Sequence, residues 1–401
     1  MPRIRIGFDR RIWVLFWSRL IDGAGFSIVY PFLALYMNQQ LGASMTLVGV
    51  VLLVAGVAGA AGSLAGGVWA DAYGRRKVMV VSMITRTLTF LLIALSVALF
   101  PDLMLVSVLL AFNFFLGGTF EPASNAMVAD VVEPARQLEA YGLMRVAWNL
   151  GFAAGPAIGG LLTSLSYELA FLSSAFVSLL AALIVMLYLS ESNMLVSKAE
   201  RKRLSLDFSG ISLSFLTFCA LCVPLFVMAG QFGTTFPVFA NDRLGIGQFA
   251  IGLVFALNGL MVALLQMPLA RWLSRYNMFG SMFFGTLIYA VGFLSLAFIW
   301  EEWGLAASMI VITLGEMVVT PVSTSLTAAY SHAEDRGRHM GIFGLIASMG
   351  WFSSSLVGGV LYDNLESSIM LWGALASLGV VSAAGMALLR LRQPIPSGDN
   401  V

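Results

Sequence analysis

Twelve long apolar runs divide the sequence, and each is long enough to cross a membrane as a helix. A helix needs about 20 mostly apolar residues to span the hydrocarbon core of a bilayer. Only 11% of the residues are charged, against about a quarter in soluble domains. The sequence therefore predicts an all-α integral membrane protein with twelve transmembrane helices. The runs fall at 12–36, 45–70, 78–99, 103–131, 137–163, 167–190, 209–239, 246–272, 277–299, 303–331, 338–362 and 367–391.

The longest polar segment follows the sixth run and divides the chain into two halves. It predicts a six-helix bundle over 1–190, a connector over 191–208 and a second six-helix bundle over 209–401. The halves also repeat, since Pro122 aligns with Pro321 and Gly159 with Gly358 in one frame. Two related bundles with a substrate site between them are a transporter architecture.

Basic residues gather in the loops on one side of the predicted membrane. They precede the first run, lie between the second and third runs and fill the connector. The opposite loops are acidic, with Arg243 as their single basic residue. Because cytoplasmic loops carry the excess of Lys and Arg, both termini are predicted to be cytoplasmic.

The composition argues against several other functions. The net charge is +1 and the basic residues are dispersed, so no nucleic-acid partner is expected. Cys219 and Cys222 form a CxxC pair in an apolar run without neighbouring histidines, and we interpret them as packing residues. Neither a metal site, a nucleotide-binding loop nor a nucleophile constellation is recognisable. The sequence therefore predicts a protein that is not an enzyme.

Three carboxylates fall well inside the apolar runs. A charge at membrane depth is costly, so such an acid is a candidate functional group. Glu316 and Asp22 lie near mid-depth and Glu121 lies nearer the cytoplasm, which makes them candidates for proton coupling or for binding a substrate cation. The alternative is a structural ion pair, for example between Glu121 and Arg86.

The loop between the second and third runs, GGVWADAYGRRKVM at 66–79, resembles the loop signature of the major facilitator superfamily. The resemblance implies a conformational latch that holds the two halves together in one state. The alternative is that its basic residues only set the topology. The second half has Ser274 at the position of the loop aspartate. The signature positions are Gly67, Asp71, Gly74, Arg75, Arg76 and Lys77.

The fifth run contains NLGFAAGPAIGG at 149–160, which resembles the fifth helix of drug:proton antiporters in that superfamily. Three of its glycines recur every four residues and share one face, where a neighbouring helix can approach closely. A plain packing stripe is the alternative reading. The residues assigned to this motif are Arg145, Gly151, Gly155, Pro156, Gly159 and Gly160.

The first run, with IDGAGFSIVYPFLALY at 21–36, is also similar to this antiporter group, whereas the fourth run departs from it. Asn113 stands where many members carry an arginine, whose charge role Arg86 or Arg145 could take. Aromatic side chains could line a central cavity, or they could face lipid or a neighbouring helix. The candidate cavity residues are Phe26, Tyr30, Asn113, Phe115, Phe232 and Phe236.

The resemblance implies a monomeric transporter in a bacterial inner membrane. It would couple inward proton movement to the efflux of lipophilic, often cationic, drug-like compounds by alternating access, with the proton gradient in place of a cofactor. The same fold could instead export or import a defined metabolite, lipid or siderophore, because promiscuity has no sequence signature.

Overall fold

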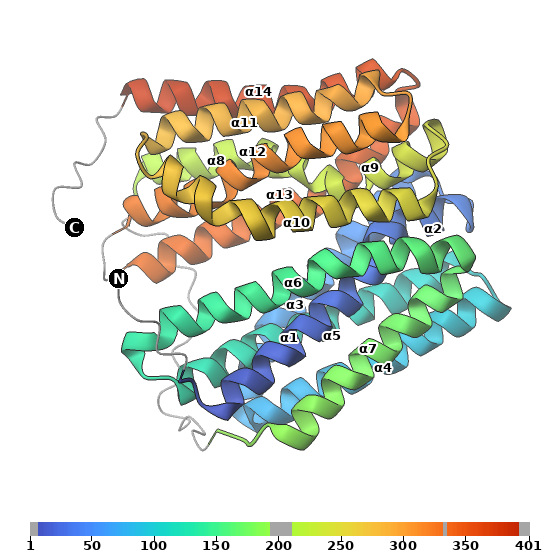
Figure 1. Cartoon of the computed structure of the whole chain (residues 1–401), viewed down its shortest axis with the longest axis vertical. Coiled ribbons are helices and arrows are strands. Elements are labelled where there is room, and N and C mark those ends of the chain that lie inside the picture. The colour runs from blue at the N-terminus through green and yellow to red at the C-terminus, as the bar shows by residue number, and fades with distance from the viewer. Residues whose placement is uncertain (1–6, 193–210, 332–334, 393–401) are drawn as a thin grey trace. The chain divides into compact units, whose positions relative to one another are not determined.

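The computed structural model describes residues 7–192, 211–331 and 335–392, and within them it is helical without strands (Figure 1). Twelve of its helical segments are long and apolar enough to cross a membrane, which confirms the predicted fold class. Most of the predicted connector lies outside the described residues. The α-helices are α1 (Arg10–Val29), α2 (Leu33–Gln39), α3 (Met45–Tyr73), α4 (Arg75–Leu99), α5 (Leu103–Val131), α6 (Gln137–Leu165), α7 (Tyr167–Tyr188), α8 (Leu213–Ala229), α9 (Thr235–Val238), α10 (Gln248–Leu273), α11 (Met278–Ser295), α12 (Glu302–Ala329), α13 (Arg336–Asn364) and α14 (Ser368–Arg392).

The seventh span is broken, whereas the sequence predicted one continuous run. A short 3-10 segment at Gly230–Gly233 separates α8 from α9, which passes into a π-helical turn at Phe239–Arg243. Glycine is a poor helix former, and backbone groups freed at membrane depth need new partners. Gln231 supplies one by donating from Nε2 to the carbonyls of Val227 and Ser354, each at 2.9 Å.

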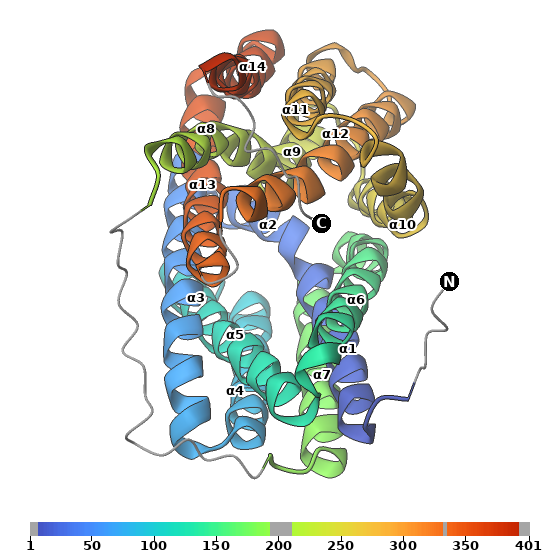
Figure 2. The ribbon, with the colours of Figure 1, turned by 90° about the vertical axis from the view of Figure 1, so that its left-hand side faces the viewer.

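Contacts between residues divide the chain into two compact units, which are described separately. Unit 1 comprises Met1–Phe32 and Val54–Leu204, and unit 2 comprises Leu33–Leu53 and Ser205–Val401. In unit 1, α1 packs against α6 and α7, while α4 packs against α5 and α7 (Figures 1 and 2). In unit 2, α11 packs against α12 and α14, α8 against α13 and α14, and α10 against α12.

The glycine stripe of α6 faces α1 within unit 1. A Cβ atom at Gly151 would lie 2.8 Å from the amide nitrogen of Ala24, and one at Gly155 would lie 2.7 Å from its oxygen. A Cβ at Gly159 would lie 2.8 Å from the carbonyl carbon of Ile28. The two helices therefore meet backbone to backbone, as the spacing of the glycines predicted. Pro156 lies inside α6 without interrupting it.

Polar contacts in unit 2 fix the ends of α3 and α13. The Asp363 carboxylate accepts from the backbone amides of Met45 at 3.0 Å and Thr46 at 2.7 Å, and so caps the first turn of α3. Arg243 donates to the carbonyls of Tyr362, Leu365 and Glu366. A cation at a helix C-terminus complements the unpaired carbonyls there. Arg243, the single basic residue of the acidic loops, therefore stabilises the C-terminus of α13.

Candidate functional site

The loop between α3 and α4 is organised around Arg75. Gly74 has a φ of 103°, a conformation that glycine adopts without steric cost. The Arg75 guanidinium is 4% exposed and lies 3.1 Å from the Asp71 carboxylate and 3.0 Å from the Asp130 carboxylate. Two acids therefore share one buried arginine, and Asp130 adds α5 to the predicted loop signature.

Residues at the end of α7 complete this cluster. The Glu191 carboxylate accepts from the backbone amide of Arg76 at 3.1 Å, and Arg76 Nη2 donates to the Met186 carbonyl at 2.5 Å. Ser192 Oγ donates to Asp130 at 2.5 Å. Sequence reasoning missed Glu191 because it lies 115 positions from its partner. Two signature positions remain. Lys77 is exposed. Gly67 faces Pro122, because a Cβ atom added at Gly67 would lie 4.0 Å from the Pro122 side chain.

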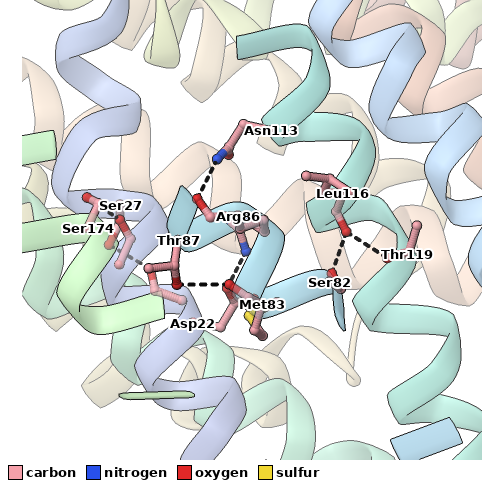
Figure 3. A network of polar contacts seen from close by, with 12 residues as sticks. Asp22, Ser27, Ser82, Met83, Arg86, Thr87, Asn113, Leu116, Thr119 and Ser174 are labelled. Carbon is pink, nitrogen blue, oxygen red and sulfur yellow. Dashed lines mark hydrogen bonds and ion pairs between the residues drawn. The ribbon is translucent and has the colours of Figure 1, made fainter. Parts of the chain in front are cut away.

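Asp22 of α1 forms a buried ion pair with Arg86 of α4 (Figure 3). The two side chains are 8% and 4% exposed. Gly117 of α5 leaves room for the guanidinium, whose Cζ would lie 3.3 Å from a Cβ there. Asn113 donates from Nδ2 to Thr89 Oγ1 at 2.7 Å and to the Arg86 carbonyl at 3.4 Å. Asn113 thus supports the turn of α4 that carries Arg86.

Glu121 pairs with Arg19, not with Arg86 as the structural alternative suggested. Arg19 Nη2 lies 2.9 Å from Glu121 Oε1, and Arg19 Nη1 donates to Asn125 Oδ1 at 3.3 Å. The Arg19 side chain is 9% exposed, whereas that of Glu121 is 68% exposed. Arg19 was not singled out from the sequence, although its place three residues before Asp22 in an apolar run could have revealed it.

Glu316 of α12 has a different environment in unit 2. Asn258 of α10 donates from Nδ2 to Glu316 Oε2 at 2.9 Å and to Thr313 Oγ1 at 3.0 Å. The Thr313 hydroxyl in turn donates to the Met309 carbonyl at 2.7 Å. Gly315 lets α11 approach, because a Cβ there would lie 2.6 Å from the Cα of Tyr289. Glu316 therefore has a neutral amide partner and, among the described residues, no ion pair.

The candidate cavity aromatics fall into separate groups. In unit 1, Phe26 and Tyr30 stack with their ring centroids 4.8 Å apart, and Trp148 lies 5.9 Å from Phe26. These three side chains are only partly buried. Phe115 is also partly buried and meets Trp69 edge to face at 6.0 Å.

The other two predicted aromatics pack inside unit 2. Phe232 and Phe236 are 7% and 0% exposed. Both meet Phe255 of α10 in T-shaped contacts, with centroid distances of 4.5 and 5.6 Å. They therefore belong to the packed interior of unit 2 in this structure. Phe255 stands one turn before Asn258, so the same stretch of α10 reaches both the aromatic cluster and Glu316.

Comparison with known proteins places these features in a family. A family model described as the Major Facilitator Superfamily matches residues 15–300 and 216–400. The Na(+), Li(+), K(+)/H(+) antiporter of Planococcus maritimus is 26% identical over 375 residues, covering 86% of this chain and 87% of the relative. Multidrug resistance protein MdtH of Proteus mirabilis is 26% identical over 375 residues and covers 89% of each chain. The solved structure of the nucleoside transporter NupG superposes with a TM-score of 0.79 at 17% identity, covering 94% of this chain and 99% of that one.

Proposed function

The chain belongs to the major facilitator superfamily, and on that premise we propose that it is a proton-coupled exporter of lipophilic, often cationic, compounds. In this proposal the transporter lies in a bacterial inner membrane with both termini in the cytoplasm. Protons moving inward drive substrates outward by alternating access. The proton gradient is the energy source, and no cofactor takes part.

The environment of Glu316 carries the proposal of proton coupling. Asp22 and Glu121 are each neutralised by an arginine within unit 1. Glu316 instead meets the neutral amide of Asn258, and in the described part of the chain no cation pairs with it to hold it in the charged form. A carboxylate that is taken out of water without a counter-ion is neutralised by binding a proton or a cationic ligand. Competition between those two ligands at one carboxylate is the exchange that an antiporter requires.

Three further observations support export of drug-like compounds. The α1–α6 glycine interface lies on the motif that resembles the drug:proton antiporters. The relative from Proteus mirabilis is named a multidrug resistance protein and aligns along most of both chains. The partly buried rings of Phe26, Tyr30 and Trp148 also offer flat surfaces on which a lipophilic cation could stack.

Proteoliposomes with an imposed pH gradient test the proposal. The full chain should move a fluorescent lipophilic cation against its concentration gradient, and collapse of the pH gradient should stop this movement. Glu316→Gln should abolish gradient-driven movement while downhill flux continues. Glu302→Gln, an exposed change at the start of the same helix, is the matched control. Movement of the fluorescent cation that does not depend on the pH gradient, or full active transport by Glu316→Gln, would refute proton coupling through this residue.

Exchange of inorganic monovalent cations is the second candidate function. Glu316 and Thr313 place a carboxylate and a hydroxyl on the two sides of the Asn258 amide nitrogen, and carboxylate and hydroxyl oxygens are of the kind that hard cations bind. The Planococcus maritimus relative is named for Na(+), Li(+) and K(+) exchange with H(+). Proteoliposomes loaded with a pH-sensitive dye separate the two candidates. Proton flux that follows added Na⁺ or K⁺ rather than an organic cation would favour this second function.

A further inference from the structure

We propose that Arg145 forms a subsite on unit 1 for the carboxylate of a lipophilic organic acid or zwitterion. The inference rests on the proposed function, because it takes unit 1 to present one face to the path of a small organic substrate. It adds a chemical requirement to the proposed class of lipophilic compounds, namely a carboxylate on the substrate.

Arg145 is an exposed cation in the first third of α6. It lies eight positions after the start of α6, which is about 12 Å along the helix axis. Its side chain is exposed, and among the described residues it has neither a hydrogen-bond nor an ion-pair partner. A charge at such depth is tolerated where it faces a water-filled cavity or meets a counter-charge. An unpaired guanidinium there is therefore available to a ligand.

The charges of unit 1 leave Arg145 as the uncompensated one. The described residues place five charged side chains well inside its spans. Two ion pairs, Asp22 with Arg86 and Arg19 with Glu121, cancel four of them. The remaining positive charge favours an anionic group at this face, and a guanidinium matches a carboxylate with two parallel hydrogen bonds.

Glu121 lies at the same depth as Arg145. Tyr141 of α6 donates from its hydroxyl to the Asn125 carbonyl of α5 at 3.3 Å, which fixes the relative height of the two helices. The helices run in opposite directions as successive spans. Arg145 lies four residues after Tyr141 on α6, and the exposed Glu121 lies four residues before Asn125 on α5. Both are therefore one helical turn from that bond in the same direction. The Arg19–Glu121 ion pair therefore lies at the level of Arg145 and leaves Arg145 as the charge without a partner at that level.

The direction of Arg145 agrees with a substrate-facing surface. Arg145 lies about 120° around α6 from Gly151, the nearest glycine of the α1 contact. Asn149 follows one turn later and is also exposed. α6 also exposes aliphatic side chains, among them Val146 and Leu150, so Arg145 and Asn149 form a polar strip beside an apolar surface.

Aromatic side chains beside Arg145 suit the apolar body of such a ligand. Trp148 lies three residues after Arg145, so both belong to neighbouring parts of one helix face. Its ring is 5.9 Å from that of Phe26, which stacks on Tyr30. The ligand class that this arrangement favours is an aromatic compound with a carboxylate.

A matched pair of dyes tests the subsite by equilibrium binding. The probes are a rhodamine with a free carboxylate and its methyl ester, measured by fluorescence polarisation with the full purified chain in detergent. Arg145→Gln should weaken binding of the carboxylate dye about tenfold or more, which corresponds to the loss of one charge-assisted hydrogen-bonded pair. The ester dye should change by less than about twofold. Arg145→Lys should retain part of the preference, because it keeps the charge but loses the planar fork.

Arg271→Gln controls for loss of a positive charge, since Arg271 is exposed in the last turn of α10. Equal losses for both dyes in Arg145→Gln, an unchanged ratio, or wild-type protein that binds neither dye would overturn the subsite. A gradient-driven transport assay of the ester dye distinguishes this failure from that of the proposed function. If the ester is actively transported and the ratio of affinities for the two dyes is the same in Arg145→Gln as in the wild type, only the subsite is overturned. Selective loss of carboxylate binding without gradient-driven flux would overturn only the proton coupling.

Discussion

Replacing one glycine of the α6 stripe should destabilise the protein because both sides of the contact are backbone. In Gly159→Ala the new Cβ would lie 2.8 Å from the carbonyl carbon of Ile28, whereas carbon atoms in contact prefer about 3.5–4.0 Å. The helices must separate locally by about 1 Å. A backbone carbonyl cannot rotate away as a side chain can, so the whole α1–α6 contact has to adjust.

The expected loss is about 1–3 kcal/mol in the free energy of unfolding, the usual range for overpacking. Gly142→Ala on the same helix is the matched control, because nothing lies within 4 Å of a Cβ at that position. That change should be neutral or stabilise by up to about 1 kcal/mol through helix propensity. The measurement is reversible unfolding in mixed micelles of detergent and denaturing surfactant. If Gly159→Ala were as stable as Gly142→Ala, the backbone contact between α1 and α6 would not exist as described.

Two other changes test contacts that hold each unit together. Asp22→Asn should lower the free energy of unfolding by about 3–5 kcal/mol because it leaves Arg86 buried without a counter-charge. The double variant Asp22→Leu with Arg86→Leu should recover most of this loss. An Asp22→Asn protein of wild-type stability would contradict the buried pair. Asp363→Ala should cost about 0.5–2 kcal/mol through loss of the α3 cap and should speed hydrogen exchange at the amides of Met45 and Thr46. The neighbouring change Asn364→Ala should leave both amides protected, and equal exchange in the two variants would exclude capping by Asp363.

The spans could be predicted from the sequence because hydrophobicity at membrane length is a local property. The α3–α4 loop signature is also a local pattern, and its Asp71 and Arg75, four positions apart, form an ion pair across Gly74. The break in the seventh span was missed, because Gly230 looks like any other glycine in an apolar run. Its effect appears only where Gln231 takes over the hydrogen bonding of the backbone.

The partners of the membrane-depth acids could not be predicted, because they depend on how each helix is rotated against its neighbours. Asp22 and Arg86 are 64 positions apart, so nothing local in the sequence links the two residues. Asn258 was overlooked because an amide in an apolar run carries no charge to draw attention. Its position opposite Glu316 follows only from the packing of α10 against α12.

The spacing of charges on α1 bears on how the protein is made. The ribosome synthesises α1 before α4 and α5, so Arg19 and Asp22 reach the membrane before Arg86 and Glu121 exist. Because they are three residues apart, the two charges face the same side of the helix and can neutralise each other there. The first segment thus has no net charge at its centre when it is inserted. In the folded protein the same two residues pair instead with Glu121 and Arg86 on later helices.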